Sequence, residues 1–252
     1  MGFVMRPVPR EGVVRTSVYQ RVEAAVEYTL ALRHPSIIRG PAGIGKTTAL
    51  ADLCAKDANA ALISASGMQK HVMQMMRLIA DALGIWQHGR TSYEVYASIV
   101  QGVPEEAAKG KYLIVDEAHR LNLDTIREIF DLWEHCGLPI VLCGNNEVAK
   151  KTRVHAATFD QISSRIGKEV SLSRNEPNDF VMLGIERNVE GKPAYEALTN
   201  YGLKTSMREA AQLLDAARLL VGPNGSIQLQ HIQETADHIF GSKRGRTLLS
   251  PE

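Results

Sequence analysis

Several features are scarce in this 252-residue chain, and each narrows the class of protein. Basic and acidic residues nearly cancel, 29 against 28, so the net charge of +1 excludes a polybasic binder without excluding a local basic surface. No apolar run approaches the roughly 20 residues that a membrane helix needs. Charged residues near the N-terminus also interrupt any signal-peptide pattern. We therefore expect a cytoplasmic protein that does not contact a membrane.

Cysteine is scarce as well. Cys54, Cys136 and Cys143 are odd in number, lack the paired spacing of metal sites and lie in segments expected to be helix or buried strand. We expect small core residues rather than disulfides or metal ligands. Hydrophobic residues make up 44% of the chain, which is enough for a sizeable core. The length suggests one large domain and one small one.

Strand and helix patterns alternate over the first two thirds of the chain. Short hydrophobic runs predict five strands, and amphipathic periods predict the helices between them. This alternation is typical of an α/β fold with a parallel five-stranded sheet flanked by helices. The predicted strands lie at 35–38, 60–64, 112–115, 138–143 and 169–172, and the predicted helices at 17–33, 47–55, 69–83, 92–100 and 124–135.

The strand pattern stops near Arg174. Pro177 is well placed to begin a helix, Ser206 and Glu209 have capping-box spacing, and an apolar helical period continues to Phe240. We therefore predict a small all-helical domain after the α/β domain. The predicted divisions are a flexible arm over 1–15, the nucleotide-binding core over 16–174, the helical domain over 175–241 and a disordered basic tail over 242–252.

The segment from Gly40 to Thr47 carries the clearest chemical signal. It satisfies the phosphate-loop pattern GxxxxGK[ST], follows a predicted strand and opens a predicted helix. Glycines let backbone N–H groups approach phosphates, Lys46 neutralises phosphate charge, and the Thr47 hydroxyl can bind Mg²⁺. The predicted nucleotide-binding residues are Gly40, Pro41, Ala42, Gly43, Ile44, Gly45, Lys46, Thr47 and Thr48.

Two further predicted strands end in polar residues that suit hydrolysis. Asp116 would hold Mg²⁺, and Glu117 would orient and deprotonate the attacking water. Asn145, with Asn146 as the reserve, would contact the γ-phosphate or that water. Residues 116–119 also spell the DEAH motif of one helicase superfamily, but those helicases need two tandem domains and only one fits here. We expect His119 to lie at a helix start or on the surface.

Together these motifs resemble the AAA+ ATPases over roughly residues 15–240. The phosphate loop, the strand ending in Asp-Glu, the strand ending in Asn and a helical lid all match that superfamily. Leu142–Asn145 and Phe159–Ile166 further resemble the DNA-transposition ATPases of the MuB, TnsC and TniB type, and similar patterns occur in ExeA-like secretion ATPases. The resemblance implies that the nucleotide is ATP.

The resemblance also assigns roles to arginines. Arg165 matches the arginine finger, which reaches the ATP of a neighbouring subunit, and Arg153 is the alternative. Arg208 matches the second sensor arginine, carried by the lid. An arginine supplied in trans makes the active species an oligomer, either a hexameric ring or a helical filament.

DNA contacts are implied for two segments after the second predicted strand. Lys70 and Arg90 would meet phosphates, and Thr91 would add a hydroxyl at a helix N-terminus. Such contacts have strong salt dependence and little sequence preference. MuB carries an additional N-terminal helix-turn-helix domain for which residues before Ser17 leave no room, so we expect the AAA+ module itself to bind DNA. The nearby methionines, Met68, Met73, Met75 and Met76, fit core packing better than a partner groove.

The implied function is an ATPase that assembles on double-stranded DNA, selects the transposition target and recruits or activates a transposase. DNA and the transposase would stimulate hydrolysis. Two alternatives stay open. One is an ExeA-like secretion or assembly ATPase, which the missing membrane segment disfavours. The other is a nucleotide-gated signalling switch, which Glu117 disfavours because it is suited to activating water for hydrolysis.

Overall fold

The computed structural model describes residues 4–5, 12–67, 71–89, 91–146 and 165–251. The chain divides into two compact units, called here the core unit and the helical unit. The core unit comprises Met1–Arg10, Arg21–Gly40 and Thr47–Leu172, and the helical unit comprises Glu11–Gln20, Pro41–Lys46 and Ser173–Glu252. Most of the phosphate loop therefore groups with the helical unit, although the chain on both sides of it belongs to the core unit.

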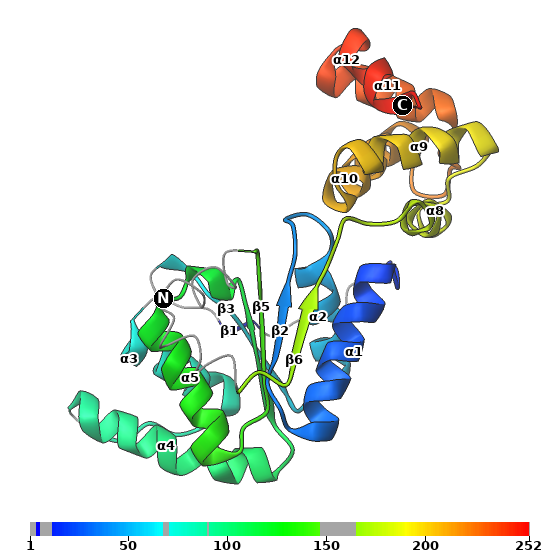
Figure 1. The fold of residues 1–252 in the computed structure, drawn as a ribbon. Helices are drawn as coiled ribbons and strands as arrows, with labels where there is room; N and C mark the ends of the chain where they lie inside the picture. Colours follow the sequence, from blue (N-terminus) through cyan, green and yellow to red (C-terminus); the bar gives the residue numbers. More distant parts are fainter. Residues whose placement is uncertain (1–3, 6–11, 68–70, 90, 147–164, 252) are drawn as a thin grey trace. The chain divides into compact units, whose positions relative to one another are not determined.

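The core unit contains a sheet with the strand order β1-β3-β4-β5-β2-β6 (Figure 1). Five of these strands are parallel, as predicted. The two-residue strand β1 pairs antiparallel with β3 at the edge, so the predicted flexible arm is wrong at these residues. The strands are β1 (Val4–Met5), β2 (Ser36–Arg39), β3 (Ala60–Ser64), β4 (Tyr112–Asp116), β5 (Ile140–Gly144) and β6 (Lys168–Ser171).

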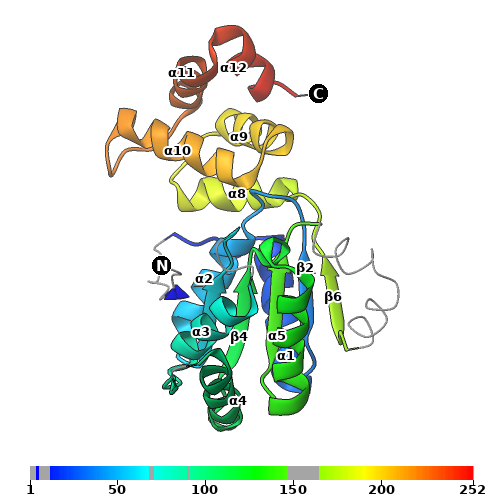
Figure 2. The same cartoon turned by 90° about the vertical axis from the view of Figure 1, so that its left-hand side faces the viewer.

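Helices cover both faces of this sheet (Figures 1 and 2). Every residue of β4 and β5 is buried, as expected for parallel strands with helices on both sides. On one face lie α1 (Ser17–Leu32) and α2 (Lys46–Lys56), and on the other lie α3 (Val72–Leu83), α4 (Ser92–Ala108) and α5 (Leu123–Cys136).

The helix predictions are correct where the apolar face is strong. Asn122 caps the start of α5 by accepting a hydrogen bond from Thr125, and Gly137 ends it in the left-handed conformation. The predicted end of α4 at residue 100 is wrong, because the helix continues past Pro104. Val103 and Ala107 extend its buried face, and this packing outweighs the missing backbone donor of proline. Met75 and Met76 are fully buried, which confirms that they belong to the core.

The helical unit surrounds a second apolar core. Helix α9 was not predicted, although Pro193 in its first turn is a helix-start signal. The predicted disordered tail over 242–252 is wrong, because residues 242–249 form the last helix. The helices are α8 (Pro177–Glu186), α9 (Lys192–Lys204), α10 (Met207–Val221), α11 (Leu229–Phe240) and α12 (Ser242–Leu249).

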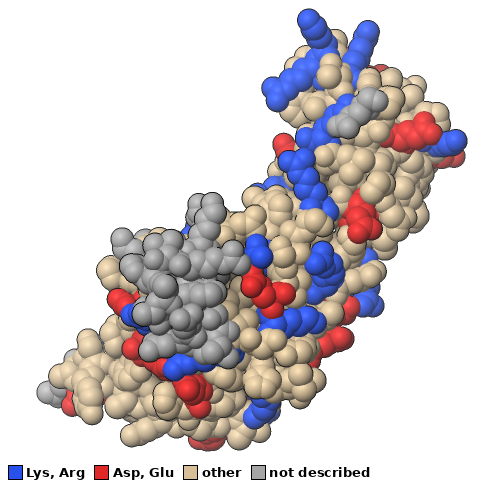
Figure 3. All heavy atoms as spheres, viewed as in Figure 1, with Lys and Arg blue, Asp and Glu red and all other residues tan. Residues whose placement is uncertain are grey.

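Contacts with other helices order α12. Gly245 approaches α11 so closely that a Cβ there would lie 3.1 Å from the Ala236 carbonyl oxygen. The Lys204 ammonium group donates to the carbonyl oxygens of Thr247 and Ser250, at 2.9 and 2.7 Å, and so satisfies the C-terminal end of the helix. The basic side chains of α12 itself are exposed, and Figure 3 shows Lys and Arg gathered over this helix. They are Lys243, Arg244 and Arg246.

Within the described part of the chain, no helix is both long and apolar enough to cross a membrane. All three cysteines are buried and none forms a disulfide with another, which confirms their assignment to the core. Burial raises the pKa of the Cys54 thiol to about 12, and the nearby Asp57 carboxylate contributes to this rise in pKa.

The burial of the cysteines generates a prediction about thiol reactivity. At pH 8 a thiol with so high a pKa is thiolate in only about one molecule in ten thousand, so Cys54 should be inert in the folded protein. We expect no thiol to react rapidly with a disulfide reagent in the native protein, and three to react in denaturant. Ser242→Cys, at an exposed position, should add one fast-reacting thiol. Rapid reaction of Cys54 in the native state would contradict the assignment.

Candidate nucleotide-binding site

Three neighbouring strands of the core unit carry the predicted chemistry at their carboxyl ends. The strand β5 lies between β2, which leads into the phosphate loop, and β4, which ends at Asp116. The Gly40 backbone N–H, directly after β2, donates to the Gly144 carbonyl oxygen at 3.3 Å. Asn145 therefore follows the strand between the other two and is half-buried. This strand order brings Asn145 and Asp116 to the same edge of the sheet.

The two predicted metal ligands, Thr47 and Asp116, are in direct contact. The Thr47 hydroxyl donates to Asp116 Oδ2 at 2.6 Å, and the other carboxylate oxygen accepts the Glu117 backbone N–H at 2.8 Å. Asp116 is only 1% exposed. The two side chains predicted to bind Mg²⁺ are thus in direct contact. Hydroxyl and carboxylate oxygens are the groups that Mg²⁺ prefers, so this donor set fits the ion.

Glu117 lies in a strained turn directly after β4. Its φ of 55° is left-handed, which is uncommon for a residue other than glycine and often marks a functional site. Its carboxylate lies 3.2 Å from Arg120 Nε and 3.5 Å from His119 Nε2. His119 is half-buried in the 3-10 turn Ala118–Arg120. Glu117 is therefore paired within its own turn and would have to exchange this pairing to activate water.

The phosphate loop contains left-handed glycines and a lysine that folds back. Gly43 and Gly45 have φ values of 79° and 104°. The Lys46 ammonium donates to the Pro41 carbonyl oxygen at 2.6 Å, across the loop, and the residue is 8% exposed. The side chain thus lies along the loop at the start of α2. In phosphate loops, this is the residue that meets the β- and γ-phosphates.

Arg208 lies against the same loop. Its backbone N–H, in the first turn of α10, donates to the Gly43 carbonyl oxygen at 2.9 Å, and its side chain is exposed. Ser206 caps α10 by accepting the Glu209 backbone N–H at 3.2 Å, as predicted. The Glu209 carboxylate accepts from the Ser206 hydroxyl at 2.8 Å, whereas in a complete capping box it would accept from the Ser206 backbone N–H.

A buried polar cluster beside the loop did not emerge from the sequence. Asn175 and Asp179 are 6% and 2% exposed, and Asn175 donates to the carbonyl oxygen of the loop residue Ile44 at 3.3 Å. The only local signal is an acidic residue in the first turn of a helix that begins at Pro177, which ordinarily indicates a cap. Nothing in the local pattern links that turn to a loop so distant along the chain.

Arg165, the predicted finger, pairs with α5 of its own chain. Its guanidinium lies 3.0 Å from Asp131 and 2.5 Å from Glu134, and the side chain is 27% exposed. A fork of this kind orients the guanidinium but also occupies it. The alternative finger, Arg153, lies outside the described residues.

The predicted DNA contacts are described only in part. Lys70 and Arg90 lie outside the described residues. Thr91 is exposed, but it caps α4: its hydroxyl accepts the Glu94 backbone N–H at 3.2 Å and lies 3.1 Å from the Glu94 carboxylate. A phosphate would meet this carboxylate as a repulsive neighbour.

Sequence comparisons with known proteins agree with the assignment of a nucleotide-binding site. Residues 33–152, from the end of α1 to beyond β5, match the AAA domain family. DNA transposition protein B of the Mu-like prophage FluMu of Haemophilus influenzae is 24% identical over 196 residues, covering 75% of this chain and 67% of that protein. The ATP-dependent target DNA activator B of Escherichia phage Mu is 21% identical over 193 residues, covering 76% of this chain and 61% of that protein. The chain is therefore similar to an AAA domain and to MuB-like transposition proteins.

Solved structures agree with this fold assignment. Cdc6p from Pyrobaculum aerophilum has a TM-score of 0.64 at 16% identity, covering 94% of this chain and 69% of that one. The RuvB Holliday junction branch migration motor of Thermotoga maritima has a TM-score of 0.58 at 18% identity, covering 88% and 68%. At these identities the likeness shows the fold alone.

The packing of the loop predicts a specific cost for Gly43→Ala. The new Cβ would lie 2.9 Å from the Ser206 hydroxyl, at a φ that already costs a side chain about 1–2 kcal/mol. Gly137→Ala is a matched control, because Gly137 is also left-handed but a Cβ added there would meet no heavy atom within 4 Å. Urea denaturation should show a larger loss of unfolding free energy for Gly43→Ala. Equal losses would mean that the contact with Ser206 does not constrain the loop.

Proposed function

We propose that this chain is an ATPase that binds double-stranded DNA with little sequence preference, assembles on it as a ring or filament, and selects the target for a transposase that it recruits or activates. The Thr47–Asp116 pair, at 2.6 Å, is the observation that carries the proposal, because it joins the phosphate loop to the metal-ligand strand. The names of the two relatives, a DNA transposition protein and an ATP-dependent target DNA activator, supply the DNA and transposition part.

Each residue of the site has a role in this proposal. Lys46 leaves the Pro41 carbonyl oxygen to meet the β- and γ-phosphates, and Thr47 and Asp116 hold Mg²⁺. When bound, Mg²⁺ neutralises the charge that develops on the phosphates. Glu117 turns from Arg120 to orient and deprotonate the attacking water, which Asn145 contacts from the adjacent strand.

The arginines act between subunits and within the lid. Arg165 would exchange its pairing with Asp131 and Glu134 for the γ-phosphate of a neighbouring subunit, with Arg153 as the alternative. Arg208 would report the nucleotide state, since its backbone already holds the Gly43 carbonyl oxygen of the loop. A finger supplied in trans requires an oligomer for hydrolysis.

DNA binding in this proposal rests on phosphate contacts. Lys70 and Arg90 are the proposed contacts. Thr91 would contribute only through the N-terminus of α4, because its hydroxyl is engaged by Glu94. Because each subunit adds a few phosphate contacts, a filament sums them even though the net charge of the chain is only +1.

One observation favours a second candidate function, a nucleotide-gated switch with slow turnover. The Glu117 carboxylate is paired with Arg120 at 3.2 Å, and a base held in this way is withdrawn from the attacking water. The two candidate functions predict different rates of ATP hydrolysis for the parent protein on DNA, and the rate is slow for the switch.

The role of Glu117 can be separated from nucleotide binding. Glu117→Gln keeps the size of the side chain but removes the base, so we expect turnover to fall at least about 100-fold. ATP-dependent co-sedimentation with random-sequence duplex at low salt should persist, because hydrolysis is needed only for release. Glu27→Gln, on the exposed face of α1, should match the parent in both assays. Parent turnover as slow as that of Glu117→Gln would favour the switch, and a failure of ATP to promote DNA binding would refute the proposal.

Mixing variants tests whether Arg165 acts in trans. Arg165→Ala alone and Lys46→Ala alone should each lose most turnover, since each subunit interface then lacks either the finger or the phosphate-binding lysine. A mixture should regain part of the activity, because some interfaces pair an intact Lys46 with an intact Arg165. The mixed ATPase rate is the measurement. Parent-like turnover of Arg165→Lys by itself would mean that charge alone suffices, and an absence of rescue in the mixture would assign Arg165 to packing against α5.

A further inference from the structure

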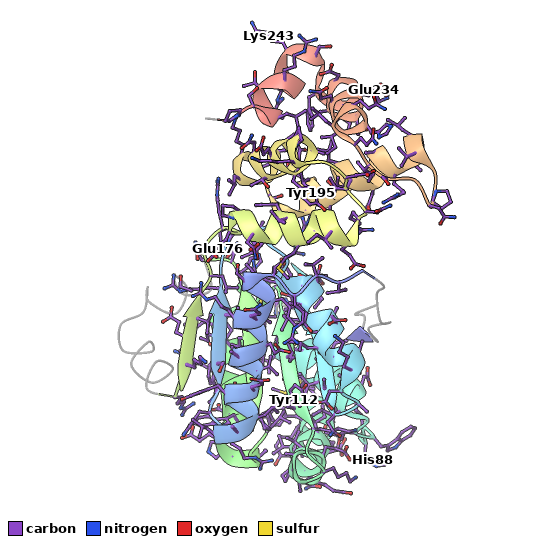
Figure 4. All side chains as sticks on the ribbon, turned by 90° about the vertical axis from the view of Figure 1, so that its right-hand side faces the viewer. His88, Tyr112, Glu176, Tyr195, Glu234 and Lys243 are labelled. Carbon is purple, nitrogen blue, oxygen red and sulfur yellow. The ribbon has the colours of Figure 1, made fainter. Side chains whose placement is uncertain are left out.

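A buried carboxylate lies at the meeting point of the three segments that make up the helical unit. Asp179 lies in the first turn of α8 and is 2% exposed; Glu176, the residue before this helix, is labelled in Figure 4. It accepts four hydrogen bonds: from the Ser17 backbone N–H and hydroxyl, both at 2.6 Å, from the Asn175 amide at 3.2 Å and from the Glu176 backbone N–H at 3.0 Å. Burial of a carboxylate is costly unless its oxygens accept several hydrogen bonds, and these four donors meet that requirement.

Asn175 links this carboxylate to the phosphate loop. Its side-chain NH₂ group has two hydrogens, and it donates to Asp179 Oδ2 at 3.2 Å and to the Ile44 carbonyl oxygen at 3.3 Å. The preceding loop residue, Gly43, is held through its carbonyl oxygen by the Arg208 backbone N–H. Two consecutive carbonyl oxygens of the loop are therefore held by residues that follow β6.

Holding these carbonyl groups has a direct consequence for phosphate binding. A peptide group is planar, so the direction of a carbonyl oxygen sets the direction of the N–H group of the next residue. The Gly43 and Ile44 carbonyl groups share their peptide planes with the N–H groups of Ile44 and Gly45, which lie within the phosphate-loop pattern. Phosphate loops bind through such N–H groups.

We propose that Asn175 is a positioning residue for ATP binding, held in place by Asp179 and Ser17. It orients the Ile44–Gly45 peptide so that its N–H group points toward the phosphates. The inference rests on the proposed function, because it requires that the loop binds ATP. It adds a route by which occupancy of the loop reaches the N-termini of α1 and α8, since Ser17 begins the first helix and Asp179 lies in the first turn of the second.

The test compares Asn175→Ala with Asn200→Ala in the full chain. Asn200 also donates its side-chain amide to a carbonyl oxygen in the helical unit, that of Leu249 at 3.2 Å, but this contact lies away from the loop. We expect Asn175→Ala to raise the dissociation constant and the KM for Mg·ATP about tenfold, the effect of one such hydrogen bond, with kcat changed less than about twofold. Asn200→Ala should bind ATP as the parent does. Both should melt at a lower temperature without nucleotide.

A second pair of variants keeps the proposal testable if Asn175→Ala does not fold. Ser17→Ala removes the hydroxyl donor to Asp179, whereas Ser17→Thr retains it. We expect weaker ATP binding for Ser17→Ala, about threefold, and binding near that of the parent for Ser17→Thr. If Asn175→Ala or Ser17→Ala lowers the melting temperature but binds ATP as tightly as the parent, the cluster is only structural and the inference fails. If the parent itself does not bind ATP, the proposed function fails.

Discussion

A phosphate-binding loop can present its backbone N–H groups only while its carbonyl oxygens are satisfied elsewhere. In this protein three of these oxygens have identified donors: Lys46 for Pro41, the Arg208 backbone N–H for Gly43 and the Asn175 amide for Ile44. One donor is the lysine of the loop itself, and two come from the segment that follows β6. The conformation of the loop therefore depends on residues that are distant along the chain.

This dependence explains why the loop groups with the helical unit while its flanks belong to the core unit. The core unit supplies the pair of Thr47 and Asp116, the strained turn at Glu117, and Asn145 at the end of the middle strand. The loop is joined covalently to β2 and α2 at its two ends, and within the helical unit hydrogen bonds join it to Asn175 and Arg208.

Local sequence predicted the elements whose signal is local. The central strands β4 and β5 are short apolar runs because both faces of the sheet are covered, and the phosphate-loop pattern reflects a backbone requirement that glycine meets. Predictions from local sequence were wrong where tertiary packing extends or orders a helix that contains proline or glycine. The helix predicted to end at residue 100 continues past Pro104 along the core, and the tail predicted to be disordered forms α12, in which Gly245 permits close approach to α11.

The sequence alone thus determined the fold class, the strands that carry the chemical residues and the identity of the nucleotide-binding motif, because each follows from burial pattern or backbone geometry within a few residues. Only the tertiary structure showed which residues form hydrogen bonds and ion pairs with the chemical residues. It paired Arg165 with α5 and Asn175 with the carbonyl oxygen of Ile44. Most hydrogen bonds and ion pairs of this kind join positions far apart in the chain, and no local periodicity encodes which donor meets which acceptor.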